Sequence, residues 1–316
     1  MAKHEGARKR RYGRYSVETS NEDKVLFAES GITKGQLIDY HERIAERMLP
    51  HLRERPLVLQ RFPDGVDAGG FYQKQASDYF PDWIPRVRVG VGDGSDSQEL
   101  VVCDMKATLG YLANQACVTL HPWLSRRDAL DCPDTLIIDL DPATDDFEAV
   151  RQAALWTRTL LDELELPGYV KLTGSKGVHV AVPLDRSADF DTVRAFARDA
   201  MDLLAGRHPD ALTTEHRKAK RAGRLYLDVA RNAYAQTAVA PWSVRPRPGA
   251  PVAAPIPWSA LESKGLGPRD FTIANVFERI ADRDDPWDGM RRHARSLGPA
   301  RERLTRLSAD EAERSA

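Results

Sequence analysis

Two apolar segments of the sequence carry acidic residues at positions where a cation could bind. The segment 135–140 (TLIIDL) is expected to be a strand that places Asp139 and Asp141 on one face, their Cα atoms roughly 6.6 Å apart. Asp228 interrupts a second expected strand, 225–229 (LYLDV). Three acids from two strands suit a pair of divalent cations that stabilises an in-line displacement, and hard oxygen ligands favour Mg²⁺ or Mn²⁺. For the Asp139/Asp141 pair alone, the alternative is a strand end exposed to solvent.

A turn with phosphate-binding character lies between these acids. Residues 173–179 read TGSKGVH, and glycines at 174 and 177 allow a tight backbone turn whose amides approach a phosphate. His179 follows this turn at the start of an expected strand. A single histidine is more often structural, but this position makes it a candidate for a role in catalysis. Further donors in the turn are Thr173, Ser175 and Lys176.

The elements that must position these residues mix strands and helices without strict alternation. This favours an α+β fold with mixed or antiparallel sheets. A basic stretch at 1–16 is expected to be flexible, 17–300 to form one catalytic domain, and 301–316 to be a charged helical tail. We expect strands at 56–60, 117–120, 169–172 and 178–182, a hairpin at 86–104, and helices at 32–52, 106–115, 147–164 and 190–204.

Composition excludes several classes of protein. The chain has 316 residues, of which 42% are hydrophobic and 29% charged, as in ordinary globular proteins. No segment reaches the roughly 20 apolar residues of a membrane span, and the N-terminus lacks the apolar core of a secretory signal, so a cytoplasmic location is expected. Cys103, Cys117 and Cys132 provide neither a disulfide framework nor zinc-site spacing.

Basic residues are concentrated in two stretches although the net charge is −1. One lies at 216–221 (HRKAKR). Basic runs favour polyanions through counterion release, and the alternative is a solvated tail and a solvated loop. The other stretch lies at 1–14, where a single acid, Glu5, accompanies six basic residues: Lys3, Arg8, Lys9, Arg10, Arg11 and Arg14.

Taken together, these motifs closely resemble the polymerase domain of bacterial DNA ligase D, within the archaeo-eukaryotic primase superfamily. The resemblance rests on LIIDLDP, TGSKGVHV, LYLDVARN and AVAPWSVRPRPGAPV, and upstream on NEDKVLFAESGITKGQLIDYH, RPLVLQRFPDG and FYQKQ. It covers about 17–300 in order. It implies a primase-like catalytic core with mixed or antiparallel sheets flanked by helices, and a nucleotidyltransferase that extends a primer 3′ end.

The resemblance also implies roles for individual residues. The three acids Asp139, Asp141 and Asp228 would hold two Mn²⁺ or Mg²⁺ ions. One of the aromatics Phe71 and Tyr72 would stack on the incoming base. Gln60 stands where some members carry lysine. Contacts to the nucleotide sugar and triphosphate are implied for His121, Thr173, Ser175, Lys176, His179, Arg231 and Arg245.

The implied nucleic-acid partner is DNA with short gaps or broken ends. Asn21, Lys24 and Lys34 match a pocket for the downstream 5′-phosphate, Arg221 a residue that positions the template end, and 86–104 a hairpin that brings ends together. The resemblance implies NTPs or dNTPs as substrates, a free-standing relative that works with a separate ligase and the Ku end-binding protein, and an association with the nucleoid.

Two other functions remain open at this stage. A haloacid-dehalogenase-like phosphatase also has paired acids after an apolar strand, but Ala143 replaces its usual Thr or Val and its first acid normally lies near the N-terminus. A DNA-end-binding bridge without turnover would need no acids, yet all three acids and His179 are present. Gap filling, end joining and priming are all compatible with the sequence.

Overall fold

The computed structural model describes residues 7–91, 96–142, 144, 146–281 and 283–315. The predicted catalytic domain consists of two compact units, each built from separated stretches of chain. Its predicted limits, 17 and 300, stay a prediction. The first unit comprises Met1–Asp128, Val239–Ala254 and Phe271–Arg283, and the second Ala129–Ala238, Pro255–Asp270 and Asp284–Ala316.

An antiparallel sheet forms the centre of the first unit. Its central strand β5 pairs with β6, β8 and β9, and β7 extends the sheet beyond β8. The expected hairpin at 86–104 is confirmed in its two strands, while residues 92–95 of its turn lie outside the described residues. The strands are β5 (Pro56–Arg61), β6 (Phe71–Gln73), β7 (Arg86–Val91), β8 (Asp96–Val102) and β9 (Cys117–Pro122).

Two helices pack together in the first unit, α1 (Lys34–Leu52) and α2 (Lys106–Asn114). Helix α1 starts at residue 34 and not at 32, because 32–33 form the short strand β4 (Ile32–Thr33), which pairs with β3 (Val25–Phe27). Thr33 then caps the helix in a capping box with Gln36.

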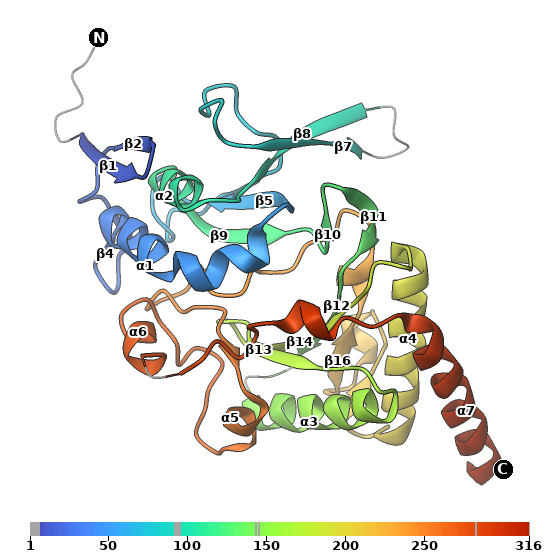
Figure 1. Cartoon of the computed structure of the whole chain (residues 1–316). Coiled ribbons are helices and arrows are strands. Elements are labelled where there is room, and N and C mark those ends of the chain that lie inside the picture. The colour runs from blue at the N-terminus through green and yellow to red at the C-terminus, as the bar shows by residue number, and fades with distance from the viewer. Residues whose placement is uncertain (1–6, 92–95, 143, 145, 282, 316) are drawn as a thin grey trace. The chain divides into compact units, whose positions relative to one another are not determined.

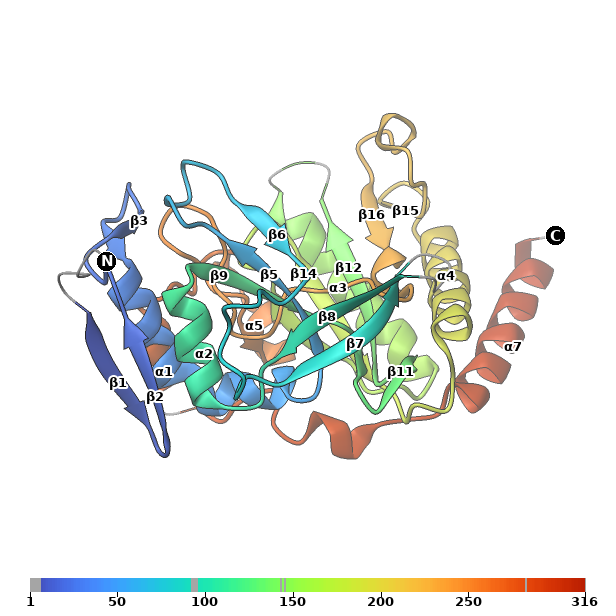
Figure 2. The ribbon, with the colours of Figure 1, turned by 90° about the horizontal axis from the view of Figure 1, so that it is seen from above.

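The basic stretch at the N-terminus, expected to be flexible up to residue 16, is a β-hairpin from Arg8 onward. Strands β1 (Arg8–Tyr12) and β2 (Tyr15–Thr19) pair antiparallel and contact α2 (Figure 2). The correction has a physical reason: Arg10 makes ion pairs with three acids, which hold the strand in place. Lys3 lies outside the described residues.

A mixed sheet with the order β15-β16-β12-β14-β13-β17 forms the second unit. β15 and β16 are parallel, and the other neighbours are antiparallel. Both sheets therefore agree with the expected α+β class. The strands are β12 (Thr135–Asp141), β13 (Tyr169–Leu172), β14 (Val178–Pro183), β15 (Leu212–Thr213), β16 (Leu225–Asp228) and β17 (Pro255–Ile256).

Helices α3 (Phe147–Glu163) and α4 (Phe190–Arg207) pack on this sheet (Figure 1). Asp146 and Asp189 cap their N-termini by accepting backbone N–H bonds. The charged end of the chain is helical, as expected, but α7 starts at residue 297 (Leu297–Ser315). The remaining elements are β10 (Ser125–Arg126), β11 (Ala129–Pro133), α5 (Trp258–Glu262), α6 (Val276–Arg279) and the 3₁₀ helices η1 (Lys218–Lys220), η2 (Ala230–Asn232) and η3 (Met290–His293).

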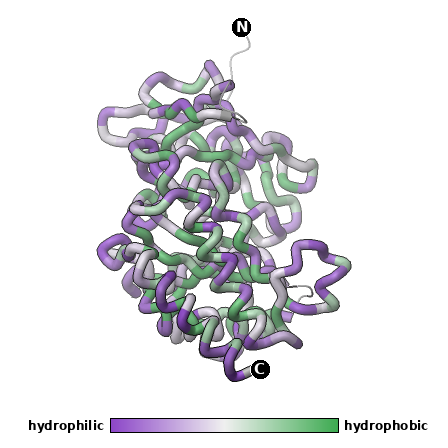
Figure 3. The backbone as a smooth tube through the Cα atoms, turned by 90° about the vertical axis from the view of Figure 1, so that its right-hand side faces the viewer, coloured by the Kyte–Doolittle hydropathy of each residue, from purple (hydrophilic) through white to green (hydrophobic). Residues whose placement is uncertain are grey.

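Each unit buries its own apolar residues. Leu37, Ile44 and Met48 line the inner face of α1, while Leu140, Val178 and Val180 are fully buried in the second sheet. Along the tube in Figure 3, hydrophobic residues concentrate in the inner segments and hydrophilic ones along the outer loops. Within the described parts of the chain, no helix is both long and apolar enough to cross a membrane.

Candidate active site

A row of ionisable residues crosses the second sheet. In the antiparallel register, Asp139 of β12 lies opposite Asp228 on β16 and opposite His179 on β14. Lys171 of β13 lies opposite His179 on the far side. Directly opposed residues point to the same face with Cβ atoms about 5 Å apart. The register therefore brings four residues from distant parts of the chain together.

Asp139 is the electrostatic centre of this row. Its Oδ1 lies 3.4 Å from Nε2 of His179, and its Oδ2 lies 3.5 Å from Nε of Arg231. Burial alone would raise the pKa of Asp139, but His179, Arg231 and Lys171 outweigh it and lower the pKa to about 2. Burial and the Lys171 cation lower the pKa of His179 to about 4. At neutral pH, an ionised Asp139 faces a neutral His179.

Asp141 and Asp228 complete the set of acids. Asp141 shares the face of Asp139, and its register partner is Tyr226, two residues before Asp228. Burial raises the pKa of Asp141, and the Asp139 and Asp228 carboxylates raise it further. Asp228 accepts a hydrogen bond of 2.8 Å from the Ala230 backbone. The like charges repel one another, and a bound cation would relieve this repulsion.

The turn after β13 is held by one hydroxyl. Thr173 Oγ1 donates to the Gly177 carbonyl at 2.9 Å and accepts from the Ser175 and Gly177 amides at 3.3 Å each. Gly174 has a φ of +66°, which favours glycine. A Cβ on Gly177 would lie 2.1 Å from the Leu140 carbonyl oxygen, so the turn packs directly on the strand of acids. Thr173 therefore holds this turn in shape, and its contact with a nucleotide stays a prediction.

The other residues of the turn are more accessible. Lys176 is exposed and Ser175 half-buried. The Ser175 carbonyl accepts a bond of 2.8 Å from Nε of Arg269, a residue that the sequence motifs did not single out. Arg269 therefore adds a cation beside the turn.

Asn232 is a positioning residue that sequence reasoning missed. Its side chain is fully buried and continues the strand ladder: Oδ1 accepts from the Ile137 amide at 2.8 Å, and Nδ2 donates to the Ile137 carbonyl at 2.7 Å. This pins η2, with Arg231, against β12 two residues before Asp139. Lys171 was missed as well, and the available signal was a lysine within the otherwise apolar segment 169–172.

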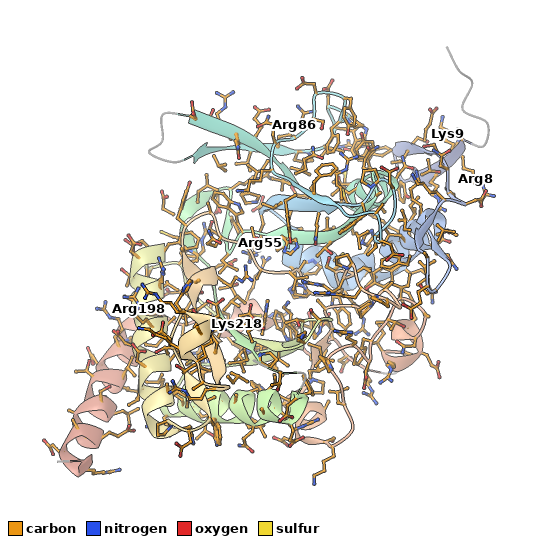
Figure 4. The ribbon with its side chains drawn as sticks, turned by 180° about the vertical axis from the view of Figure 1, so that it is seen from behind. Arg8, Lys9, Arg55, Arg86, Arg198 and Lys218 are labelled. Atoms are coloured by element: carbon orange, nitrogen blue, oxygen red, sulfur yellow. The ribbon has the colours of Figure 1, made fainter. Side chains whose placement is uncertain are left out.

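Arg221 supports its own loop. Its guanidinium donates to the carbonyls of Glu215 and His216 and lies 3.8 Å from the ring centroid of Tyr226. The loop thus rests on an aromatic ring that faces Asp141. Lys218 of η1 and Arg198 of α4 are exposed side chains of the same unit (Figure 4).

The first unit carries the aromatic candidates. Phe71 and Tyr72 on β6 are 48% and 60% exposed, unusual for large apolar rings. The Tyr72 ring lies 5.6 Å from the His121 ring in an edge-on arrangement. Arg61 lies 5.6 Å from the Phe71 ring, and it is fixed by Gln73, Tyr79 and Gln115. The structure therefore brings together Phe71, Tyr72 and His121, with Arg61 as a support that the sequence motifs did not reveal.

Two further positions belong to the same unit. Gln60, opposite Tyr72 on β5, is half-buried. Arg245 is half-buried next to the bridge between Val244 and Val252, and its backbone amide bonds the Pro251 carbonyl at 2.7 Å. The proline-rich chain around residue 245 holds Arg245 through this bridge.

Asn21, Lys24 and Lys34 converge in the first unit. The Lys24 amide donates to the Asn21 carbonyl, and the Lys34 amide to the Lys24 carbonyl at 2.9 Å. Burial lowers the pKa of Lys34, Glu22 opposes this shift and Lys24 adds to it. Lys24 Nζ forms an exposed ion pair with Asp64 at 3.1 Å. Lys24 on the loop and Lys34 at the start of α1 are close enough for their charges to interact, and two such cations suit a multiply charged anion.

The acids of the second sheet offer hard oxygen donors to a cation. As the side chains stand, no group of three or more His, Cys, Asp or Glu residues within the described ranges forms a metal cage. The backbone register nevertheless brings three hard carboxylates onto one face. Within the same described ranges, the buried Nδ1 of His179 has no hydrogen-bond partner, which a ligand would supply. The residues therefore fit a cation in chemistry and in register.

Comparisons with known proteins point in one direction. The family model described as LigD, primase-polymerase domain, matches residues 33–287. A bifunctional non-homologous end joining protein LigD from Bacillus subtilis is 33% identical over 84% of this chain and 42% of its own length. The multifunctional LigD of Mycobacterium bovis is 31% identical over 92% of this chain and 38% of its own length. The chain thus spans about two fifths of the length of these relatives.

A solved structure gives the same result for the fold. The polymerase domain from Mycobacterium tuberculosis Ligase D, in complex with DNA, superposes with a TM-score of 0.82 at 29% identity. The match covers 88% of this chain and 99% of that domain.

Proposed function

This chain belongs to the LigD primase-polymerase family and is therefore a nucleotidyltransferase, and we propose that it adds nucleotides to a primer 3′ end at short gaps or broken DNA ends. The observation that carries this proposal is the row Asp228–Asp139–His179 across three strands. The reaction is an attack of the primer 3′-oxygen on the α-phosphorus of a nucleotide, with release of pyrophosphate. Repair, by gap filling or end joining, is the context proposed from the named relatives.

The acids of the second unit would hold the cations that this reaction requires. Asp139, Asp141 and Asp228 are the proposed ligands, and a bound pair of Mg²⁺ or Mn²⁺ ions would activate the hydroxyl and balance the charge of the triphosphate. His179 supports this role as a neutral donor or acceptor beside Asp139, since its pKa lies near 4. Arg231 holds the Asp139 carboxylate in place from the other side.

Phosphate binding is proposed for the turn between β13 and β14. Lys176 is the exposed cation of this turn, and Thr173 and Gly177 keep its amides in a fixed arrangement. Fixed donors aimed at a leaving pyrophosphate stabilise it without reorganisation. In the first unit, His121 and Arg245 are proposed as further donors to the triphosphate.

The first unit has a recognition role in this proposal. The exposed rings of Phe71 and Tyr72 offer a platform for a base, and stacking tolerates any base. Asn21, Lys24 and Lys34 are proposed to bind the downstream 5′-phosphate, and Arg221 in the second unit to contact the template end. A 5′-phosphate contact favours short gaps over long templates.

One experiment tests the proposed activity. A duplex with a short gap and a downstream 5′-phosphate is incubated with NTPs or dNTPs, in Mg²⁺ or in Mn²⁺. Expected is extension of the primer by the gap length, with one pyrophosphate released per nucleotide. Binding of the DNA without extension would favour an end-bridging protein, and release of inorganic phosphate without extension would favour a phosphatase.

A further inference from the structure

The N-terminal hairpin presents two chemically different faces. Side chains alternate along its strands, so Arg10 and Tyr12 of β1 point inward with Val17 and Thr19 of β2. Lys9 and Arg11 alternate with them and are exposed. A folded strand thus carries fixed cations on its outer face, in contrast to a solvated tail.

The inner face anchors the hairpin firmly. Arg10 donates to both carboxylate oxygens of Glu22, at 3.0 and 2.8 Å, and also to Asp39 at 2.6 Å and Glu42 at 3.0 Å. The bond from Arg10 lowers the pKa of Glu22 to about 2. Tyr12 lies so close to Gly110 that a Cβ there would meet its hydroxyl at 2.3 Å. This bidentate pairing and close packing hold the strand in one register.

The outer face is positive. Lys9 and Arg11 are joined by Arg14 at the turn. Arg8, which Figure 4 shows near Lys9, shares the side of Arg10 and pairs with Glu22 at 3.4 Å. The acid on this face is Glu18, which lies opposite Lys9 in the register, and Arg11 lies opposite Ser16. Cations therefore outnumber acids on a surface one strand pair wide.

The anchor joins this surface to the candidate phosphate pocket. Glu22, which forms the bidentate ion pair with Arg10, follows Asn21 directly and precedes Lys24 by two residues. Its backbone carbonyl also accepts from the amide of Gly35, next to Lys34. The second strand of the hairpin ends at Thr19, two residues before Asn21, so the hairpin and the pocket are also adjacent in the sequence.

We propose that the outer face of the β1–β2 hairpin binds the phosphate backbone of the downstream DNA duplex, next to the terminal 5′-phosphate. This inference rests on the proposed 5′-phosphate pocket, because the duplex begins at that phosphate. Duplex DNA carries one charge per about 1.7 Å, and cations arrayed along a strand match such a partner without reading its sequence. The contact would add affinity that increases with the length of the downstream duplex.

The test compares gapped DNAs that differ only downstream of the gap. One has a loop-closed downstream duplex of about half a helical turn, and the other one of about two turns, where one turn is about 10 bp. Affinity is measured by fluorescence anisotropy over a series of salt concentrations. We expect the intact chain to bind the longer duplex about tenfold more tightly, because only the longer duplex offers further phosphates to the hairpin. Each phosphate contact should also add about 0.9 to the salt slope.

The decisive variant removes charge and keeps side-chain bulk. Lys9→Gln/Arg11→Gln/Arg14→Gln is expected to lose this length advantage and to lower the salt slope by about 2–3, with an unchanged melting temperature, since the residues are exposed. The matched control changes three exposed arginines of α7, in the second unit, and should behave like the intact chain: Arg301→Gln/Arg306→Gln/Arg314→Gln.

Two results would overturn the proposal. The hairpin variant could retain the full length advantage and salt slope, or the α7 control could lose as much as the hairpin variant. Failure of the 5′-phosphate pocket is a separate outcome. It would appear as equal binding of 5′-phosphate and 5′-hydroxyl gaps by the intact chain, whatever the length of the downstream duplex.

Discussion

The residues at the centre of each unit's proposed role differ in exposure. In the second unit, Asp139, His179 and Asp228 are set side by side by the register of a buried sheet. In the first unit, Phe71, Tyr72 and Lys24 are exposed on a short strand and a loop. Reaction chemistry needs groups fixed to fractions of an ångström, whereas contact with a long flexible polymer needs accessible surface. The difference supports the proposal that the second unit carries out catalysis and the first unit carries out recognition.

The largest effect is expected from neutralising the acids of the second unit, which tests its assignment to catalysis. Asp139→Asn or Asp228→Asn should reduce primer extension at least about a thousandfold, because each removes a charge that the reaction requires. Affinity for gapped DNA should change little. Extension is measured on the gapped duplex, with the exposed Asp199→Asn on α4 as the control. Substantial extension by either acid variant would remove the assignment of the row as the catalytic centre.

A second test compares two asparagines whose side chains each hydrogen-bond to backbone groups of another segment. Buried Asn232 satisfies both backbone groups of Ile137, and its change to alanine should lower the free energy of unfolding by about 2–4 kcal/mol. Asn114, half-buried in the first unit, bonds the Ser20 amide and the Glu18 carbonyl, and Asn114→Ala should lower it by about 1 kcal/mol. Urea unfolding measures both. Equal losses would contradict the larger contribution expected from the fully buried Asn232.

Recognition by the first unit should appear in binding and not in the chemical step. Tyr72→Ala or Phe71→Ala should raise the KM for the nucleotide about tenfold and leave kcat within a few-fold, because a stacked base is worth about 1–3 kcal/mol. Tyr72→Phe keeps the ring and should retain the original KM. Steady-state kinetics on a single-nucleotide gap would contradict the idea if kcat fell while KM stayed constant.

The phosphate pocket should show an effect that depends on the DNA end. Lys24→Ala/Lys34→Ala should reduce the preference for a 5′-phosphorylated gap over a 5′-hydroxyl gap about tenfold, since two charge-assisted bonds are removed. Competition between the two DNAs measures this preference directly. An unchanged preference would show that these lysines do not bind the phosphate.

The smallest expected effect concerns pH and buried His41 of α1. Burial lowers the pKa of His41 from 6.5 to about 4, so below pH 6.5 the unfolded chain binds a proton that the folded chain does not. Stability is therefore lost as the pH falls from 6.5 towards 4. His41→Leu should remove up to about 1.4 kcal/mol per pH unit from this slope. The measurement is urea unfolding at pH 7 and pH 5, and parallel pH dependences of the two proteins would contradict it.

The parts of the fold that could be expected from the sequence have strong periodicity. The alternation of 135–140 placed Asp139 and Asp141 on one face, and the expected helices and strands of both units are present. Register between distant strands is not encoded in local periodicity, so the contact of Asp139 with His179 and the position of Lys171 needed the structure. The roles of individual residues in catalysis and binding stay predictions.

Other features had weak or misleading signals. The hairpin at 8–19 was missed because its composition is that of a solvated tail, while its ion pairs join Arg10 to acids up to 32 residues away. Asn232 was missed because its two bonds to Ile137 span 95 residues. In both cases the stabilising partner is distant in sequence, and no local sequence pattern predicts the contact.

The interleaving of the two units has a consequence for how the chain acquires its structure. In the first unit, β9 depends on residues 243–244: the Leu120 amide donates to Ser243 Oγ at 2.9 Å, and Thr119 Oγ1 donates to the Val244 carbonyl at 2.7 Å. In the second, Trp287 donates to the Val170 carbonyl. The first unit therefore cannot complete these contacts during synthesis before residue 244 has left the ribosome, nor the second before residue 287 has. The two units therefore do not follow the usual route of paired domains, in which the N-terminal domain folds before the next one is synthesised.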